Sequence, residues 1–205
     1  ASTAVTSPTT SSYTNASGGN PTNTSGRNYV QWLWQAGSSA ASSNTSGSIT
    51  STTSVNATAG FSIVTYTGTG ANGTVGHGLG VAPKMIIVKE RSTTRDWAVW
   101  HTTLTGGQVL FLNSTLATQA DTAVWNNTSP TSSVFSASTS TYTNQSTGTY
   151  VAYCFAEVAG YSKFGSYTGN GSTDGPFIYL GFRPKFVLIK RSSGANSWVI
   201  LDAAR

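Results

Sequence analysis

The sequence contains few charged residues. Only 8% of its 205 residues are Asp, Glu, Lys or Arg, which is about a third of the usual share in a globular protein. Six residues are acidic, and no two of them stand out as the pair that carboxylate catalysis requires. A surface so poor in charge must be built from Ser, Thr, Asn and Gly, a composition typical of extracellular fibres, adhesins and capsid-type proteins.

Cysteine occurs once, so the chain cannot form an internal disulfide. Cys154 lies among Ala152, Tyr153 and Phe155. These neighbours favour a small buried hydrophobic residue. A reactive thiol would need a basic environment, which this part of the sequence does not supply.

A long apolar run and a concentrated basic patch are also missing. No stretch of about 20 apolar residues occurs, so no segment is predicted to span a membrane. The 11 Lys and Arg residues give a net charge of +5, but they are spread thinly, whereas nucleic-acid binding needs them on one face. We therefore expect neither a membrane nor nucleic acid as a partner.

The basic residues that do gather flank the most apolar runs of the chain. They are Lys84, Lys89, Arg91 and Arg95, and then Lys185, Lys190 and Arg191. Positive charges in such places keep exposed strands from pairing with other chains. We favour this role over a binding patch for an anionic ligand.

Residues that carry chemistry are few and scattered. His77 and His101 lack metal-ligand spacing relative to each other or to Cys154. The paired glycines open no predicted helix, so they do not indicate a phosphate cradle; the pairs are Gly68 with Gly70 and Gly169 with Gly171. We therefore predict no catalytic residue, no metal site, no cofactor and no enzymatic activity.

What the sequence does contain is an internal repeat. Segments 66–100 and 167–201 both carry a Tyr-Thr-Gly-x-Gly string, then a Pro-Lys pair, a short apolar run and a tryptophan. The two segments align without a gap at an interval of 101 positions, which separates Tyr66 from Tyr167, Pro83 from Pro184 and Trp97 from Trp198. The repeated residues are those of turns and cores, so what the copies share is architectural.

A second echo precedes each of these segments. The string Tyr-Val-Gln-Trp-Leu-Trp-Gln-Ala at 29–36 matches Tyr-Val-Ala-Tyr-Cys-Phe-Ala-Glu at 150–157, at an interval of 121 positions. Alternating bulky residues in both strings have the two-residue period of a half-buried strand. We expect strands at both places, with their aromatic side chains in the core.

Short β-branched and aromatic runs separated by turn residues recur along the rest of the chain, and no ten-residue stretch has a helical period. The predicted strands are 29–36, 60–67, 84–89, 97–100, 109–112, 123–125, 134–135 and 150–157. Asn72-Gly73 predicts a tight hairpin, Ser193–Asn196 a second hairpin loop, and 37–59 a polar connector. The fold class is therefore all-β, an antiparallel β-sandwich built from two internally repeated units.

This domain is predicted to cover residues 29–205, with units at about 29–101 and 150–202 and a connecting β segment. Residues 1–28 form a Ser/Thr/Asn-rich tract whose bulky apolar residues are Val5 and Tyr13. Such a segment is disordered when alone in water. For it to be ordered, neighbouring subunits must hold it. We expect it to be such an ordered arm or assembly segment.

The tryptophans divide by whether the other copy has a counterpart. Those with an aromatic counterpart are expected to be buried, and they are Trp32, Trp34, Trp97 and Trp198. Trp100 aligns with Leu201, and Trp125 has no counterpart. If the module binds glycans, Trp125 and Trp100 are the better stacking surfaces, with Asn126 and Asn127 as donors to sugar hydroxyls. The alternative is that Trp125 belongs to the core.

Several strings together resemble a β-rich domain that recurs in tail-fibre and other virion structural proteins of tailed bacteriophages, especially marine ones. They are 164–171, 181–191, 78–89 and 124–126, with Trp198 and the Asp202-Ala-Ala-Arg205 string, and the resemblance covers most of 29–205. It implies a virion structural protein located in the extracellular virion. The implied partners are further copies of the chain or other virion proteins, and host cell-surface polysaccharide. The family pattern continues past the last string.

Two other functions fit the sequence. The composition also suits an extracellular filament subunit or adhesin of cellular origin. A polysaccharide-degrading tail enzyme would place its substrate between the two units, but the scarcity and scatter of acidic residues argue against it.

Overall fold

The computed structural model describes residues 12–15, 22–37 and 40–203. By its internal contacts the chain divides into Ala1–Trp34 and Gln35–Arg205. Most of the predicted arm at 1–28 lies outside the described residues, so the arm stays a prediction.

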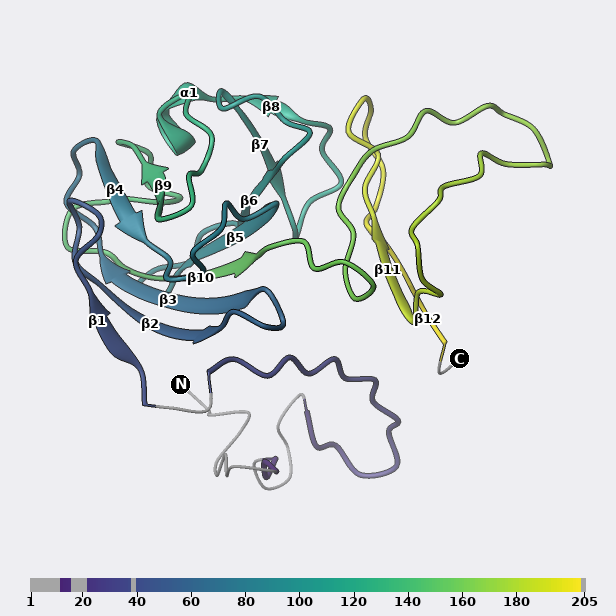
Figure 1. Cartoon of the computed structure of the whole chain (residues 1–205), viewed down its shortest axis with the longest axis horizontal. Helices are drawn as coiled ribbons and strands as arrows, with labels where there is room; N and C mark the ends of the chain where they lie inside the picture. Colours follow the sequence, from purple (N-terminus) through teal and green to yellow (C-terminus); the bar gives the residue numbers. More distant parts are fainter. Residues whose placement is uncertain (1–11, 16–21, 38–39, 204–205) are drawn as a thin grey trace. The chain divides into compact units, whose positions relative to one another are not determined.

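The larger unit is built on one eight-stranded antiparallel sheet (Figure 1). The strand order is β1-β2-β3-β10-β5-β6-β7-β8. The strands are β1 (Ser42–Asn44), β2 (Ser51–Asn56), β3 (Phe61–Thr67), β10 (Thr149–Phe155), β5 (Met85–Glu90), β6 (Ala98–His101), β7 (Gln108–Phe111) and β8 (Gln119–Ala120). The all-β prediction is confirmed, since the sheets are antiparallel and helix is almost absent from the described residues.

Two smaller sheets and one helical turn complete the unit. β4 (Gly73–Gly76) pairs with β9 (Val134–Ala137), and β11 (Phe186–Ile189) pairs with β12 (Val199–Asp202). The helical turn is α1 (Thr122–Trp125). Whether these layers amount to a β-sandwich of two repeated units stays a prediction.

The central strands bury side chains on both faces, as their continuous apolar runs predict. Along β5, Ile86 and Val88 enter one core cluster, which also holds side chains of β4, β9 and α1. Met85 and Ile87 enter a second cluster on the opposite face, against which Leu188 and Trp198 of the C-terminal hairpin pack. The alternation of side chains along a strand therefore divides the core into two layers.

Four predicted elements differ from the structure. Residues 29–36 form no strand, and 37–59 contains β1 and β2 instead of a plain connector. The segment 123–125 lies in the helical turn α1, because the carboxylate of Asp121 accepts a hydrogen bond from Ala123 N at 2.9 Å and caps the turn. Asn72-Gly73 makes no β3–β4 hairpin, because both edges of β3 are occupied by β2 and β10.

The two repeated segments agree in one part and differ in another. In the β5–β6 hairpin Met85 lies opposite His101, and in the β11–β12 hairpin Phe186 lies opposite Asp202, which is the same register at the 101-residue interval. The predicted hairpin loop at 193–196 is confirmed. Upstream the segments differ: β3 has no counterpart strand, and Tyr167 is exposed.

Candidate functional site

Of the two positions considered for Trp125, the structure shows the one in the core, so its ring is not available as a glycan platform. Trp125 is only 2% exposed and belongs to the main core cluster, because α1 packs against β7 and β9. Asn126 and Asn127 are exposed and hold left-handed backbone conformations that end the turn. Asn126 Oδ1 accepts a hydrogen bond from Asn72 Nδ2 at 3.1 Å, so its amide serves the loop.

Three of the other tryptophans differ from the prediction. Trp100, the second proposed stacking residue, is 4% exposed in the core, whereas Trp32 and Trp34 are exposed. Trp97 and Trp198 are half-buried. Trp100 and Trp125 enter the main core cluster. Trp97 and Trp198 pack at the side of the second cluster, and Trp32 and Trp34 lie on the segment that forms no strand.

The first Tyr-Thr-Gly-x-Gly string is held by the loop that precedes β10. Asn144 is fully buried; its Oδ1 accepts from Thr69 N at 2.7 Å and its Nδ2 donates to Ala71 O at 2.6 Å. Gly68 N donates to Gly148 O at 2.8 Å. This motif therefore holds two loops together, and its backbone groups are already used.

A buried carboxylate lies beside the same loops. Glu90 is 1% exposed and accepts a hydrogen bond from Ser92 Oγ at 2.9 Å. Arg95 Nε lies 3.5 Å from Glu90 Oε2, and Arg95 Nη2 donates to Gln145 Oε1 at 3.3 Å. Through Arg95 the carboxylate thus connects β5 to the loop before β10. Its contacts therefore hold these two elements together.

His77 is buried and engaged at both ring nitrogens. Its Nδ1 accepts from Leu79 N at 3.2 Å, and its Nε2 lies 3.2 Å from Thr131 O. These contacts fix the neutral tautomer with the proton on Nε2. Burial lowers the pKa of His77, and the Thr131 carbonyl offsets part of that shift. The ring therefore connects two loops as a neutral group.

Acid is expected to weaken the fold through this histidine. Because its pKa is lower in the folded chain, the unfolded chain binds the proton first, so stability is complete above pH ~6.5 and falls below it, by at most about 1.4 kcal/mol per pH unit. Burial lowers the pKa of His101 as well, with the same sign. Urea unfolding at pH 7.5 and 5.5 measures the loss. His77→Gln should reduce it, and an unchanged loss would contradict this assignment.

Cys154 is expected to resist thiol reagents in the folded protein. Burial raises the pKa of its thiol to about 12, and its side chain is fully buried in the main core. Little thiolate exists at pH 8, and the reagent cannot reach it. Labelling with a colorimetric disulfide should be complete in denaturant and at least a hundredfold slower without it. Fast labelling of the folded chain would show that β10 opens readily.

The described residues contain neither a metal-binding cluster nor a membrane-spanning helix. No group of three or more His, Cys, Asp or Glu side chains is placed to hold a metal ion within the described ranges. None of the helices in the same ranges is long and apolar enough to cross a membrane.

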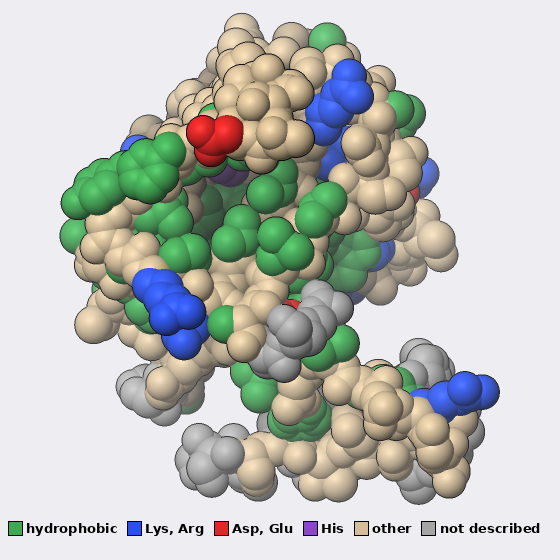
Figure 2. All heavy atoms as spheres, turned by 90° about the vertical axis from the view of Figure 1, so that its right-hand side faces the viewer, with side chains coloured by type: hydrophobic (Ala, Val, Ile, Leu, Met, Phe, Trp, Pro, Cys, Tyr) green, Lys and Arg blue, Asp and Glu red, His purple; other side chains and the backbone are tan. Residues whose placement is uncertain are grey.

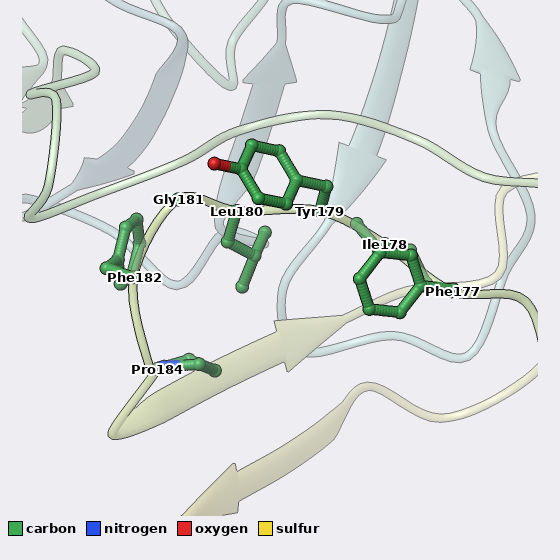
Figure 3. A pocket seen from close by; sticks show the side chains of 7 residues that line it. All are labelled: Phe177, Ile178, Tyr179, Leu180, Gly181, Phe182 and Pro184. Atoms are coloured by element: carbon green, nitrogen blue, oxygen red, sulfur yellow. The ribbon is translucent and has the colours of Figure 1, made fainter.

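The exposed feature that the sequence analysis missed is an apolar run before β11. Phe177 is 90% exposed and Tyr179 is 78% exposed. Figure 3 shows the two rings with Ile178, Leu180 and Phe182 along one bend that ends at Pro184 and lines an open hollow. On the side of the molecule that carries the C-terminal hairpin, hydrophobic side chains gather around a hollow (Figure 2). The repeat alignment could have revealed this run, because Phe177 and Tyr179 stand where the first segment has glycines, at 76 and 78.

The fold places the chain among all-β proteins with antiparallel sheets. The chain belongs to the family described as a domain of unknown function (DUF7483), whose profile matches residues 1–205. No curated protein and no solved structure matches the chain.

Proposed function

We propose that this chain is a non-enzymatic structural module of a bacteriophage virion, carried by a tail fibre or a related appendage. The phage-domain resemblance of the strings at 164–171 and 181–191 supports the virion setting. The structural role is supported by one observation above all. Three of the groups that could carry chemistry are committed to packing: His77, Glu90 and Cys154 are each at most 1% exposed.

The partners in this proposal are further copies of the chain, other virion proteins, and polysaccharide on the host surface. The exposed rings of Phe177 and Tyr179 take the place of Trp125 as the surface able to stack on sugars. A duplicated β-sandwich is part of the same proposal, and the shared register of the two hairpins supports it.

Mass spectrometry of purified virions from the phage that encodes the chain tests the proposal. We expect the chain in the virion at a copy number typical of an appendage protein. Its absence from virions would reject the virion role. Release of reducing ends from host polysaccharide, abolished by one Asp or Glu substitution, would reject the non-enzymatic role.

A filament subunit or adhesin of cellular origin is the second candidate. It is favoured by the same charge-poor surface and by a two-stranded hairpin whose outer strand face exposes Val199 and Leu201. Neighbouring genes distinguish the two, since tail and baseplate genes indicate a virion and a secretion operon indicates a cellular filament.

A further inference from the structure

The segment that precedes the missing strand at 29–36 has the same local structure as the segment that precedes β10. Thr24 N donates to the Tyr29 hydroxyl at 2.9 Å, and 121 positions later Gln145 N donates to the Tyr150 hydroxyl at 2.8 Å. Residue identities agree as well, since Thr-Asn-x-Ser stands at 22–25 and at 143–146.

Two further features of the backbone repeat at this interval. Arg27 N donates to Thr24 O at 3.3 Å, and Gly148 N donates to Gln145 O at 3.0 Å. Gly26 and Thr147 both have positive φ, at 72° and 64°. The sequence echo at 29–36 is therefore preceded by the same turn as β10, yet 29–36 belongs to no strand, and Val30 and Leu33 are 56% and 71% exposed.

The C-terminal hairpin lacks the neighbour that its counterpart has. In the first copy, β10 lies between β3 and β5 and pairs with both. In the second copy, β11 pairs with β12 alone among the described residues. The string at 162–168 aligns with β3 at the interval of 101 positions. It forms no strand, and only Ser162 makes an isolated bridge, with Val158. One edge of β11 is therefore not paired with any described strand, and this edge corresponds to the place that β10 takes beside β5.

We propose that residues 29–36 of a second copy of this chain fill that place. The donated strand would complete the second copy of the motif as β10 completes the first, by adding a strand to an open sheet edge. Its register follows from β10: Trp32 lies opposite Leu188, Leu33 opposite Val187 and Trp34 opposite Phe186, as Tyr153, Cys154 and Phe155 lie opposite Ile87, Ile86 and Met85.

The chemistry of the donated strand fits a half-buried edge. Val30, Trp32 and Trp34 share one face, because side chains alternate along a strand. Their counterparts Tyr153 and Phe155 pack on the cluster that also contacts Leu188 and Trp198. The opposite face of the donated strand carries Gln31, Leu33 and Gln35. In the first copy β4 and β9 cover the corresponding face of the sheet; two glutamines suit a face that is not covered in this way.

The loop contacts of the first copy also carry over. Asn23 stands where Asn144 binds Thr69 N and Ala71 O, and the corresponding groups are Asn170 N and Ser172 O of the acceptor. The same equivalence brings Arg27 close to Arg191, where the first copy has Gly148 and Glu90. Association should therefore strengthen with added salt, which screens this repulsion.

A second copy fits better than the segment of the same chain. Gln35 O accepts from Asn56 Nδ2 at 3.2 Å, which ties it to β2. The C-terminal hairpin is tied to the β7 side through Trp198 Nε1, which donates to Phe111 O at 2.9 Å. Four strands separate β2 from β7, about 24 Å at ordinary strand spacing. Gln35, the end of the donor that lies in the larger unit, is thus far from the acceptor hairpin, and pairing between chains would join copies head to tail.

The first test places cysteines in the proposed register, in the Cys154→Ser background. A full chain with Leu33→Cys is mixed with a tagged full chain with Val187→Cys and oxidised mildly. We expect a disulfide between the two chains. The control replaces Val187→Cys by Leu188→Cys, whose side chain points to the opposite face, and it should not cross-link. Equal cross-linking of the two pairs, or a disulfide formed only within a doubly substituted single chain, would overturn the proposal.

The second test uses two glycines that have open space around them in the folded chain. A Cβ at Gly169 or at Gly165 meets nothing within 4 Å. Gly169 corresponds to Gly68, where a Cβ would overlap Gln145 O; in the assembly that oxygen is the donor's Thr24 O. Gly165 corresponds to Val64, where a side chain is accommodated.

Analytical ultracentrifugation of the full chain measures the outcome. We expect wild type to form concentration-dependent oligomers, Gly169→Ala to weaken association at least tenfold, and Gly165→Ala to leave it unchanged. A wild-type chain that stays monomeric at all concentrations, or an equal effect of the two substitutions, would overturn the proposal.

Discussion

Replacing Trp125 with alanine should lower the free energy of unfolding by about 3–5 kcal/mol. The ring is almost fully buried in the main core cluster, where α1 packs over β7 and β9. Its Nε1 has no hydrogen-bond partner among the described residues, so the loss comes from packing and the cavity that remains. Urea unfolding followed by tryptophan fluorescence and circular dichroism measures the change.

Phe177→Ala is the matched control for that substitution. It also removes an aromatic ring, but one that is 90% exposed, so the free energy of unfolding should change by less than about 0.5 kcal/mol. If Trp125→Ala lowered the free energy of unfolding no more than Phe177→Ala does, the buried position of the Trp125 ring would be wrong. Trp125 would then again be a candidate for stacking on glycans.

Gly68→Ala should lower the free energy of unfolding by about 3 kcal/mol, at the upper end of the usual cost of overpacking. A Cβ at Gly68 would overlap Gln145 O, and the nearest atoms are mostly backbone, which cannot rotate away. Separating the loops would also lengthen the bond from Thr147 N to Gly68 O, now 2.9 Å. Thermal and urea unfolding measure the loss.

Gly169→Ala is the control at the same place in the second motif. Its Cβ meets open space within its own chain, so in dilute solution the substitution should leave the unfolding midpoint unchanged. If Gly68→Ala and Gly169→Ala destabilised the dilute protein equally, the second motif would already be closed within one chain, and no open place would exist beside β11.

The strands that the sequence predicted well are those with a strong apolar pattern and with both edges paired. The runs at 60–67, 84–89 and 150–157 became β3, β5 and β10 within one or two residues, because their apolar side chains had two core layers to enter. The hairpin at 186–202 was also predictable, since its turn and its apolar runs repeat those of 85–101.

The failures follow from contacts that local pattern does not carry. The string at 29–36 is as strand-like as β10, but a strand forms only when it pairs with another strand, and the structure assigns 29–36 to no strand. The segment 123–125 forms a helical turn because the side chain of Asp121 caps it. The repeat was a poor guide to which tryptophans are buried. It shows that an aromatic ring recurs at a position, whereas the burial of the ring depends on the elements that pack over it.

Hydrogen exchange followed by mass spectrometry, over a range of protein concentrations, tests the central claim most directly. The claim is that one copy of the motif is closed within the chain by β10 and the other by residues 29–36 of another copy. We predict that the amides of β10 are protected at every concentration, and that those of 29–36 and 186–189 gain protection together as concentration rises. Fast exchange at 29–36 at all concentrations, or protection there that does not depend on concentration, would contradict the claim.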